Sequence, residues 1–138
     1  MTTKEKLLHT GLLVLRIGIG ISFFFHGLPK VMGGVEGWTQ VGSTMALFGL
    51  DFAPAFWGFM AAMAETVGGI LFALGFLFRP ASLMMAFTMI VALIMHLSNG
   101  DAFLQYSHAL ESLILFAAMT IAGPGRYSVD AKFLPKIS

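Results

Sequence analysis

Hydrophobic positions along the chain gather into four long apolar segments that short polar stretches separate. Each segment is close to the length of about 20 predominantly apolar residues that a membrane-spanning helix needs. Pro29 is expected to end the first segment, and Gly123 with Pro124 the last. The pattern predicts an all-α integral membrane protein with four transmembrane helices in an antiparallel up-down-up-down bundle, in a single domain that covers residues 1–138. The predicted spans are 7–28, 52–78, 80–97 and 106–122.

The first outer loop, between the first two predicted spans, is long for a connection in a helix bundle. It has a helical pattern of its own, because Trp38, Val41, Met45 and Phe48 recur at three- to four-residue spacing. We therefore expect a short amphipathic helix in the outer membrane interface. An interfacial Trp usually anchors such a helix at headgroup level. The alternative is that the helix forms a lid over a site between the helix ends.

Composition supports the membrane assignment and narrows the chemistry. The chain is 57% hydrophobic and 11% charged, whereas soluble domains are about 25% charged, which excludes a water-soluble monomer. The net charge of +1 without a basic face gives no indication of nucleic-acid binding. The chain has no Cys, so disulfides, thiolate metal sites and dithiol redox chemistry are excluded. Any electron transfer would need a bound cofactor or a quinone.

Positive charges predict the orientation in the membrane. With four spans, six of the Lys and Arg residues outside the helix interiors fall on one side of the membrane, and Lys30 alone falls on the other. The positive-inside rule then places both termini in the cytoplasm. The six residues are Lys4, Lys6, Arg79, Arg126, Lys132 and Lys136.

Two charged residues lie deep within predicted spans, where charges are costly and usually face inward. Counted from the first residues of their segments, Arg16 and Glu65 both fall near the membrane midplane. We predict that they form a buried ion pair. Such a pair would either fix the helix register or handle protons or a ligand.

A second polar group is expected near the outer rim of the bundle. His26 and His96 end two outward-running helices, and His108 and Glu111 share a face at the start of the last one. These four residues could be simple interface anchors. They could also bind a quinone or another small ligand, with His relaying a proton, or hold a metal or a haem.

Five short stretches resemble the DoxX family, in order along almost the whole chain. RIGIG and FHGLPK resemble the family's opening helix, AETVGG its second helix, HLSNG the end of its third and GPGRYSVD its tail. These stretches are residues 16–20, 25–30, 64–69, 96–100 and 123–130.

The resemblance implies a multi-pass protein of the bacterial cytoplasmic (inner) membrane. Family members are commonly described as oxidoreductases or as accessory subunits of quinone-linked oxidoreductases. The family supplies no assigned catalytic residues, so none are carried over. The motif positions that this chain shares with the family are Arg16, His26, Glu65 and His96.

From the residues and the resemblance together, the hypothesis is a quinone-associated redox protein or an accessory subunit of a membrane oxidoreductase complex. Quinone is the expected cofactor, with a metal or haem as the alternative. The expected partners are the lipid bilayer, a membrane or soluble redox partner and a second copy of the chain, with no nucleic acid. The alternative functions are a non-enzymatic scaffold or assembly subunit and a small-solute or ion permease.

Overall fold

The computed structural model describes all 138 residues and is helical throughout, without strands. Three of its helices, α1, α3 and α4, are long and apolar enough to cross a membrane. The all-α membrane fold is therefore confirmed, while a four-span bundle remains a prediction because α5 is not among the three. The elements are α1 (Thr3–Met32), α2 (Gly34–Gly42), the 3-10 helix η1 (Ser43–Phe48), α3 (Pro54–Leu74), α4 (Phe78–Ser98), α5 (Phe103–Ala122) and α6 (Val129–Phe133).

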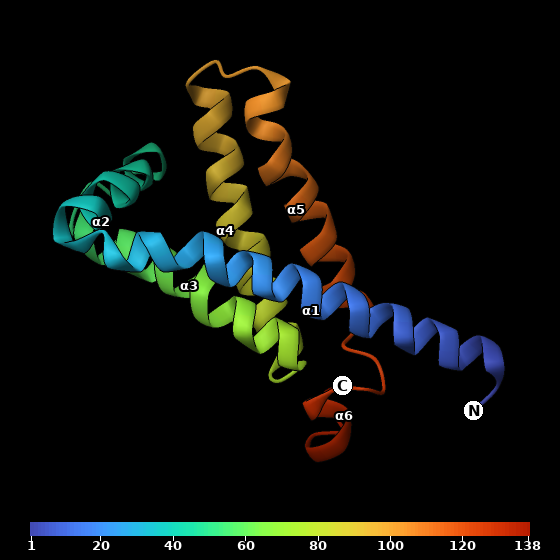
Figure 1. Ribbon diagram of the computed structural model, residues 1–138. Coiled ribbons are helices and arrows are strands. Elements are labelled where there is room, and N and C mark those ends of the chain that lie inside the picture. Colours follow the sequence, from blue (N-terminus) through green and yellow to red (C-terminus); the bar gives the residue numbers. More distant parts are fainter.

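The four long helices are arranged as two pairs rather than as an even bundle. Helix α1 packs along α3, and α4 packs along α5. The α4–α5 hairpin rises away from the α1–α3 pair, so that the two pairs are close at one end and splayed at the other (Figure 1). The buried core lies where the pairs meet, and Phe23, Phe72, Phe78 and Phe116 are at its centre.

Small residues set the packing of α1 against α3. A Cβ atom added to Gly20 would lie 2.5 Å from the carbonyl oxygen of Gly69, and one added to Gly27 would overlap with Thr66. The two backbones can approach this closely only because Gly20 and Gly27 themselves lack side chains. Gly20 faces residues that come later in α3 than those facing Gly27, so the two helices run antiparallel.

Pro29 does not end the first helix, contrary to the sequence prediction. Helix α1 continues through Pro29 to Met32. Pro removes only one backbone donor, and a neighbouring group can satisfy the carbonyls that are left free. The carbonyl that Pro29 leaves without its usual donor is that of Phe25, four residues earlier. Trp38 instead caps the end of α1, because its Nε1 donates to the carbonyls of Lys30 and Val31 at 3.0 and 3.1 Å. The extension keeps Lys30 on the helix, one turn after His26.

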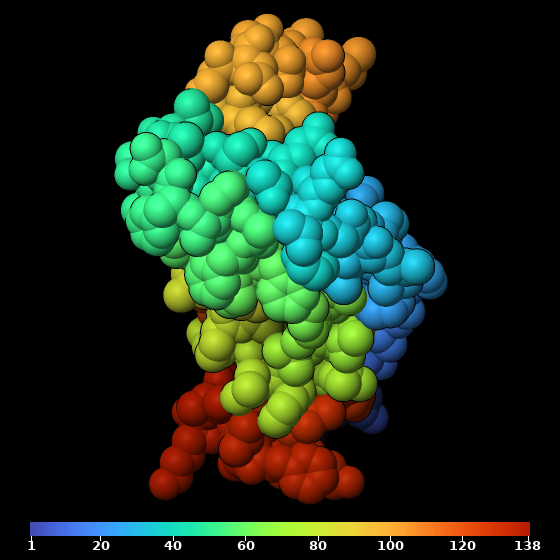
Figure 2. Space-filling model, turned by 90° about the vertical axis from the view of Figure 1, so that its left-hand side faces the viewer, coloured from blue at the N-terminus to red at the C-terminus, as the bar shows by residue number.

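The expected helix in the first outer loop is present, and it packs on protein. Trp38 and Val41 lie in α2, and Met45 and Phe48 lie in η1. The Trp38 ring meets Phe59 edge to face at 4.9 Å, and Gly42 and Gly58 bring α2 and α3 into backbone contact. Figure 2 looks onto this face, where the cyan-to-green atoms of α2 and η1 lie below the orange tip of the α4–α5 hairpin. The position of α2 in the membrane interface remains a prediction.

The C-terminal tail packs on the α3–α4 turn, at the end of the fold where the two helix pairs are close together; this end is called the narrow end. Asp130 is fully buried, and its carboxylate accepts hydrogen bonds from the backbone N–H groups of Leu77 and Phe78 at 2.9 and 2.8 Å. Arg79 Nη1 donates to the carbonyls of Thr120 and Ile121 at 2.9 and 3.0 Å. The tail and the α3–α4 turn are thereby joined, and Arg79, expected only to set orientation, also ties α4 to the end of α5.

Candidate functional site

The predicted Arg16–Glu65 ion pair is wrong, because each residue has a different partner. Lys30 Nζ lies 2.9 Å from Oε1 and 3.0 Å from Oε2 of Glu65. Arg16 is buried and its guanidinium donates to the backbone carbonyls of Tyr127 and Ala73. Glu65 therefore faces inward as expected, but its cation comes from the far end of α1.

The relative placement of α1 and α3 explains the difference. Arg16 lies at the level of the last turn of α3, whereas Glu65 lies at the level of Gly27. Positions 16 and 27 are 11 residues apart, which is roughly 16 Å along a helix at about 1.5 Å per residue. Counting from the first residue of each segment assumed that the two antiparallel segments cover the same depth, whereas α3 is shifted along α1 toward the end that carries Lys30.

The Lys30–Glu65 pair joins a buried group to a partly exposed one. Glu65 is 4% exposed, whereas the Lys30 side chain is 42% exposed. A buried carboxylate is costly unless it is paired and hydrogen-bonded, and Lys30 supplies both conditions through its two contacts. The two opposite charges cancel, and the Lys30 end of the pair remains accessible from outside the protein.

His26 and His108 come together beside this pair, as the sequence predicts. Their ring centroids are 5.0 Å apart at an interplanar angle of 34°. Phe23 lies against both rings, stacked on His108 at 5.8 Å and tilted against His26 at 5.7 Å. Besides His26, the ionisable groups close enough to act electrostatically on His108 are Glu65, Lys30 and Glu111. These five ionisable residues, His26, Lys30, Glu65, His108 and Glu111, form the polar cluster.

His96 lies outside the polar cluster, so its predicted convergence with the other two histidines is wrong. Its Nδ1 is 2.7 Å from Oδ2 of Asp101, across the α4–α5 turn. The physical reason is the splay of the two helix pairs, which carries the end of α4 away from α1.

The predicted histidines and Glu111 are not arranged to bind a metal ion or a haem. No group of three or more His, Asp or Glu side chains lies in a geometry that could hold a metal ion, so the three histidines and Glu111 do not assemble a metal site. The two clustered histidine rings lie partly stacked on each other, rather than facing each other across the space that a haem with two axial histidines needs.

A cavity of about 500 Å³ opens on the other side of Glu65, between α2, η1, α3 and α4. This volume is in the range of small-molecule sites. Apart from Lys30 and Glu65, its polar lining consists of Gln40, Thr44, Trp57 and Thr88. The Nε1 atom of Trp57 is buried and has no hydrogen-bond partner. The main apolar lining side chains are Met45, Met60, Met84, Phe87, Val91 and Met95.

This cavity was not predicted from the sequence, although two features of the sequence are consistent with it. The spacing of apolar residues over 38–48 left a lid as an alternative, and α2 and η1 do form one wall. Met84 and Met95 belong to a Met-rich helix, which is more typical of packing or lipid contact. Only the tertiary arrangement shows that they line the same cavity as Glu65.

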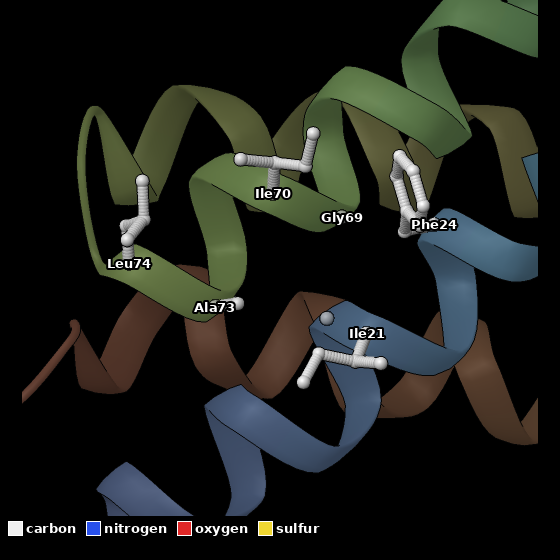
Figure 3. A pocket seen from close by; sticks show the side chains of 7 residues that line it. Ile21, Phe24, Gly69, Ile70, Ala73 and Leu74 are labelled. Carbon is white, nitrogen blue, oxygen red and sulfur yellow. The ribbon is translucent and has the colours of Figure 1, made fainter.

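A second, smaller hollow of about 230 Å³ is entirely apolar. It lies where α1 crosses α3, and Figure 3 shows Ile21 and Phe24 of α1 on one side and Ile70, Ala73 and Leu74 of α3 on the other. It contains no polar group that could orient a ligand. The cavity beside Glu65, together with the polar cluster, is therefore the candidate site.

Three helices of spanning length, two of which are joined by the ion pair between Lys30 and the buried Glu65, define a helical membrane protein. The family model described as DoxX matches residues 11–97. The chain belongs to the DoxX family. No solved structure matches the chain.

Relatives among known proteins support the family and its location. A Bacillus subtilis (strain 168) protein named "Putative oxidoreductase CatD" is 37% identical over 90 residues, which are 65% of this chain and 62%, less than two thirds, of that protein. Inner membrane proteins YqjF and YphA of Escherichia coli (strain K12) are 32% and 31% identical over 129 residues each. These two alignments cover 91% and 88% of this chain and 94% and 89% of the relatives. Together with the apolar helices, these names support an inner-membrane location.

Proposed function

We propose that the chain is a quinone-associated redox protein of the inner membrane, or an accessory subunit of a membrane oxidoreductase complex. The observation that carries the proposal is the position of Glu65, a buried carboxylate that lines a largely apolar cavity and lies within electrostatic range of His108. Family membership and the name of the Bacillus relative support redox chemistry. The proposed topology has four spans and both termini in the cytoplasm.

The residues fit a quinone better than a metal or a haem. The cavity offers an apolar lining, and the buried N–H of Trp57 lacks an acceptor. A bound quinone supplies two-electron chemistry, in which reduction to the quinol consumes two electrons and two protons. Since the chain has no Cys, the electrons are exchanged with a redox partner.

The polar cluster supplies the protons in this proposal. The Glu65 carboxylate, which Lys30 stabilises in its charged form, takes up a proton and passes it on at the cavity. His26 and His108 pass protons between Glu65 and the surface, because an imidazole ring can accept a proton on one nitrogen and donate one from the other. Glu111, which is exposed, is the outer end of this route.

Protein purified in mild detergent from quinone-containing membranes is expected to retain quinone at an appreciable fraction of one molecule per chain. Replacing Lys30 by Met should lower the retained quinone about fivefold or more, because the buried carboxylate then loses its only cation and the site reorganises. Quinone is measured by organic extraction and mass spectrometry, normalised to protein.

Glu36→Gln is the matched control, since Glu36 is exposed on α2 and makes no side-chain hydrogen bond or salt bridge. It should retain as much quinone as the unmodified chain. If the unmodified chain retains no more quinone than an unrelated membrane protein of similar size, the proposal is rejected. A scaffold or a permease would then be the better hypothesis, and solute flux into liposomes separates these two.

A further inference from the structure

We infer that the quinone ring binds inside the cavity between α2, η1, α3 and α4, and that the histidines do not hold it. This inference rests on the proposed function and locates its ligand. The sequence alone predicts a ligand among the outer helix ends, at His26, His96, His108 and Glu111. The structure divides those residues and places the enclosed volume beside Glu65 instead.

The charge balance of the lining favours an uncharged ligand. Lys30 and Glu65 are the only charged residues that line the cavity, and they neutralise each other at 2.9 Å. Every other polar lining group is neutral. An anionic headgroup would compete with Glu65 for its cation, and a cationic one would compete with Lys30 for its anion. A neutral ring with apolar substituents competes with neither.

The unpartnered N–H of Trp57 favours a ligand with an acceptor, which the N–H reaches once the indole ring turns toward the cavity. A buried donor without a partner costs about 1–3 kcal/mol, so that a group able to accept its hydrogen bond gains affinity in this cavity. A ring carbonyl is such an acceptor, whereas a plain hydrocarbon chain is not. The aromatic and thioether side chains of Trp57, Phe87 and the methionines suit the faces of a flat ring.

Helix η1 is the wall through which the ring would enter. Helix α2 is held against α3 by backbone contacts at Gly42 and Gly58. In contrast, η1 is a short 3-10 helix whose one hydrogen bond to α4 runs from Thr44 Oγ1 to Met95 Sδ at 3.4 Å. It ends at Gly49, which has a φ of 79°, a conformation natural to glycine. Displacing η1 therefore breaks one weak side-chain hydrogen bond and its packing on α3 and α4, and leaves α2 in place.

The test uses 2-methyl-1,4-naphthoquinone as the probe and 2-methylnaphthalene as its match without carbonyls. Both are titrated into the full-length protein in detergent, by equilibrium dialysis against protein-free micelles. We expect saturable binding of the quinone, with 2-methylnaphthalene about fivefold weaker because the Trp57 N–H gains nothing from it. Trp57→Phe should weaken quinone binding by a similar factor and leave 2-methylnaphthalene unchanged.

Ala61→Phe places a ring in the cavity, because Ala61 lines it, and should weaken quinone binding at least tenfold. Ala117→Phe, at an exposed position on α5, is the control and should bind as the unmodified chain does. Circular dichroism establishes that each variant is folded. Trp57→Phe keeps an aromatic ring, so it tests the site even if Ala61→Phe disrupts the local packing.

The outcomes separate the inference from the proposed function. If the unmodified chain binds the quinone and neither Ala61→Phe nor Trp57→Phe weakens binding, the cavity is not the ring site and the proposed function stands. The same holds if His108→Gln abolishes binding and Ala61→Phe does not. Equal affinity for the quinone and the hydrocarbon also overturns the inference, since the cavity would then be filled by any apolar chain. Absence of saturable quinone binding overturns the proposed function itself.

Discussion

Replacing Asp130 by Ala is expected to lower the free energy of unfolding by about 3–6 kcal/mol. The estimate comes from two hydrogen bonds to a charged acceptor, each worth about 1.5–3 kcal/mol. The lost bonds are those that Leu77 and Phe78 donate at the start of α4. Because Asp130 is fully buried, water cannot replace the lost acceptor. The Arg16 guanidinium also loses the one carboxylate near enough to attract it.

Asp130→Asn should have an intermediate effect, since one amide oxygen remains to accept a hydrogen bond while the amide NH₂ meets the second N–H. Asp51→Ala is the matched control, because Asp51 is exposed and makes no side-chain hydrogen bond or salt bridge, and it should stay within about 0.5 kcal/mol of the unmodified chain. Unfolding in detergent, followed by circular dichroism, measures all three variants. Equal losses for Asp130→Ala and Asp51→Ala would show that the tail does not hold the α3–α4 turn.

Helices were predictable from the sequence, but several of their ends were not. The apolar segments locate all four long helices, since spanning-length apolar runs are a strong signal. The first helix was expected to stop at Pro29, yet it runs to Met32. The indole N–H of Trp38 satisfies backbone carbonyls at its end. The second was expected to reach Phe78, but Gly75, with a φ of 67°, ends α3 at Leu74.

The candidate site shows where prediction from sequence fails. That Glu65 faces inward follows from the cost of a charge in hydrocarbon. Which cation it meets depends on the relative shift of α1 and α3, which is set by the facing glycines. The meeting of His26 and His108 was predictable because both lie near outer helix ends, whereas the exclusion of His96 follows from the splay of the two helix pairs, which no local pattern encodes.

The family motifs acquire a physical meaning in the structure. The first motif supplies Arg16, and the last one supplies Tyr127, whose carbonyl accepts a hydrogen bond from it. Asp130, in the same last motif, caps the start of α4. Residues from both ends of the chain thus meet at the narrow end of the fold. Arg16 therefore belongs to the packing of the tail, and the proton route of the proposed function begins at Glu65.

Gly58→Ala is expected to destabilise the protein by about 3 kcal/mol or more, the upper range for overpacking. A Cβ atom at position 58 would overlap with the backbone carbonyl of Trp38. The obstacle is a helix backbone that cannot rotate away as a side chain could, so α2 must lift from α3. The thermal midpoint in detergent measures the loss of stability.

Gly18→Ala is the control for the effect of replacing a helical glycine by alanine where there is no steric overlap. Gly18 also lies within a long helix, but an added Cβ would meet nothing within 4 Å, so this change should be neutral or should stabilise by up to about 1 kcal/mol through helix propensity. Lifting α2 also displaces Gln40 and Val41, which line the cavity, so Gly58→Ala should lower quinone retention even at temperatures where the variant remains folded. If Gly58→Ala and Gly18→Ala were equally stable, α2 would not be packed against α3 as described, and the cavity would lack the wall that encloses it.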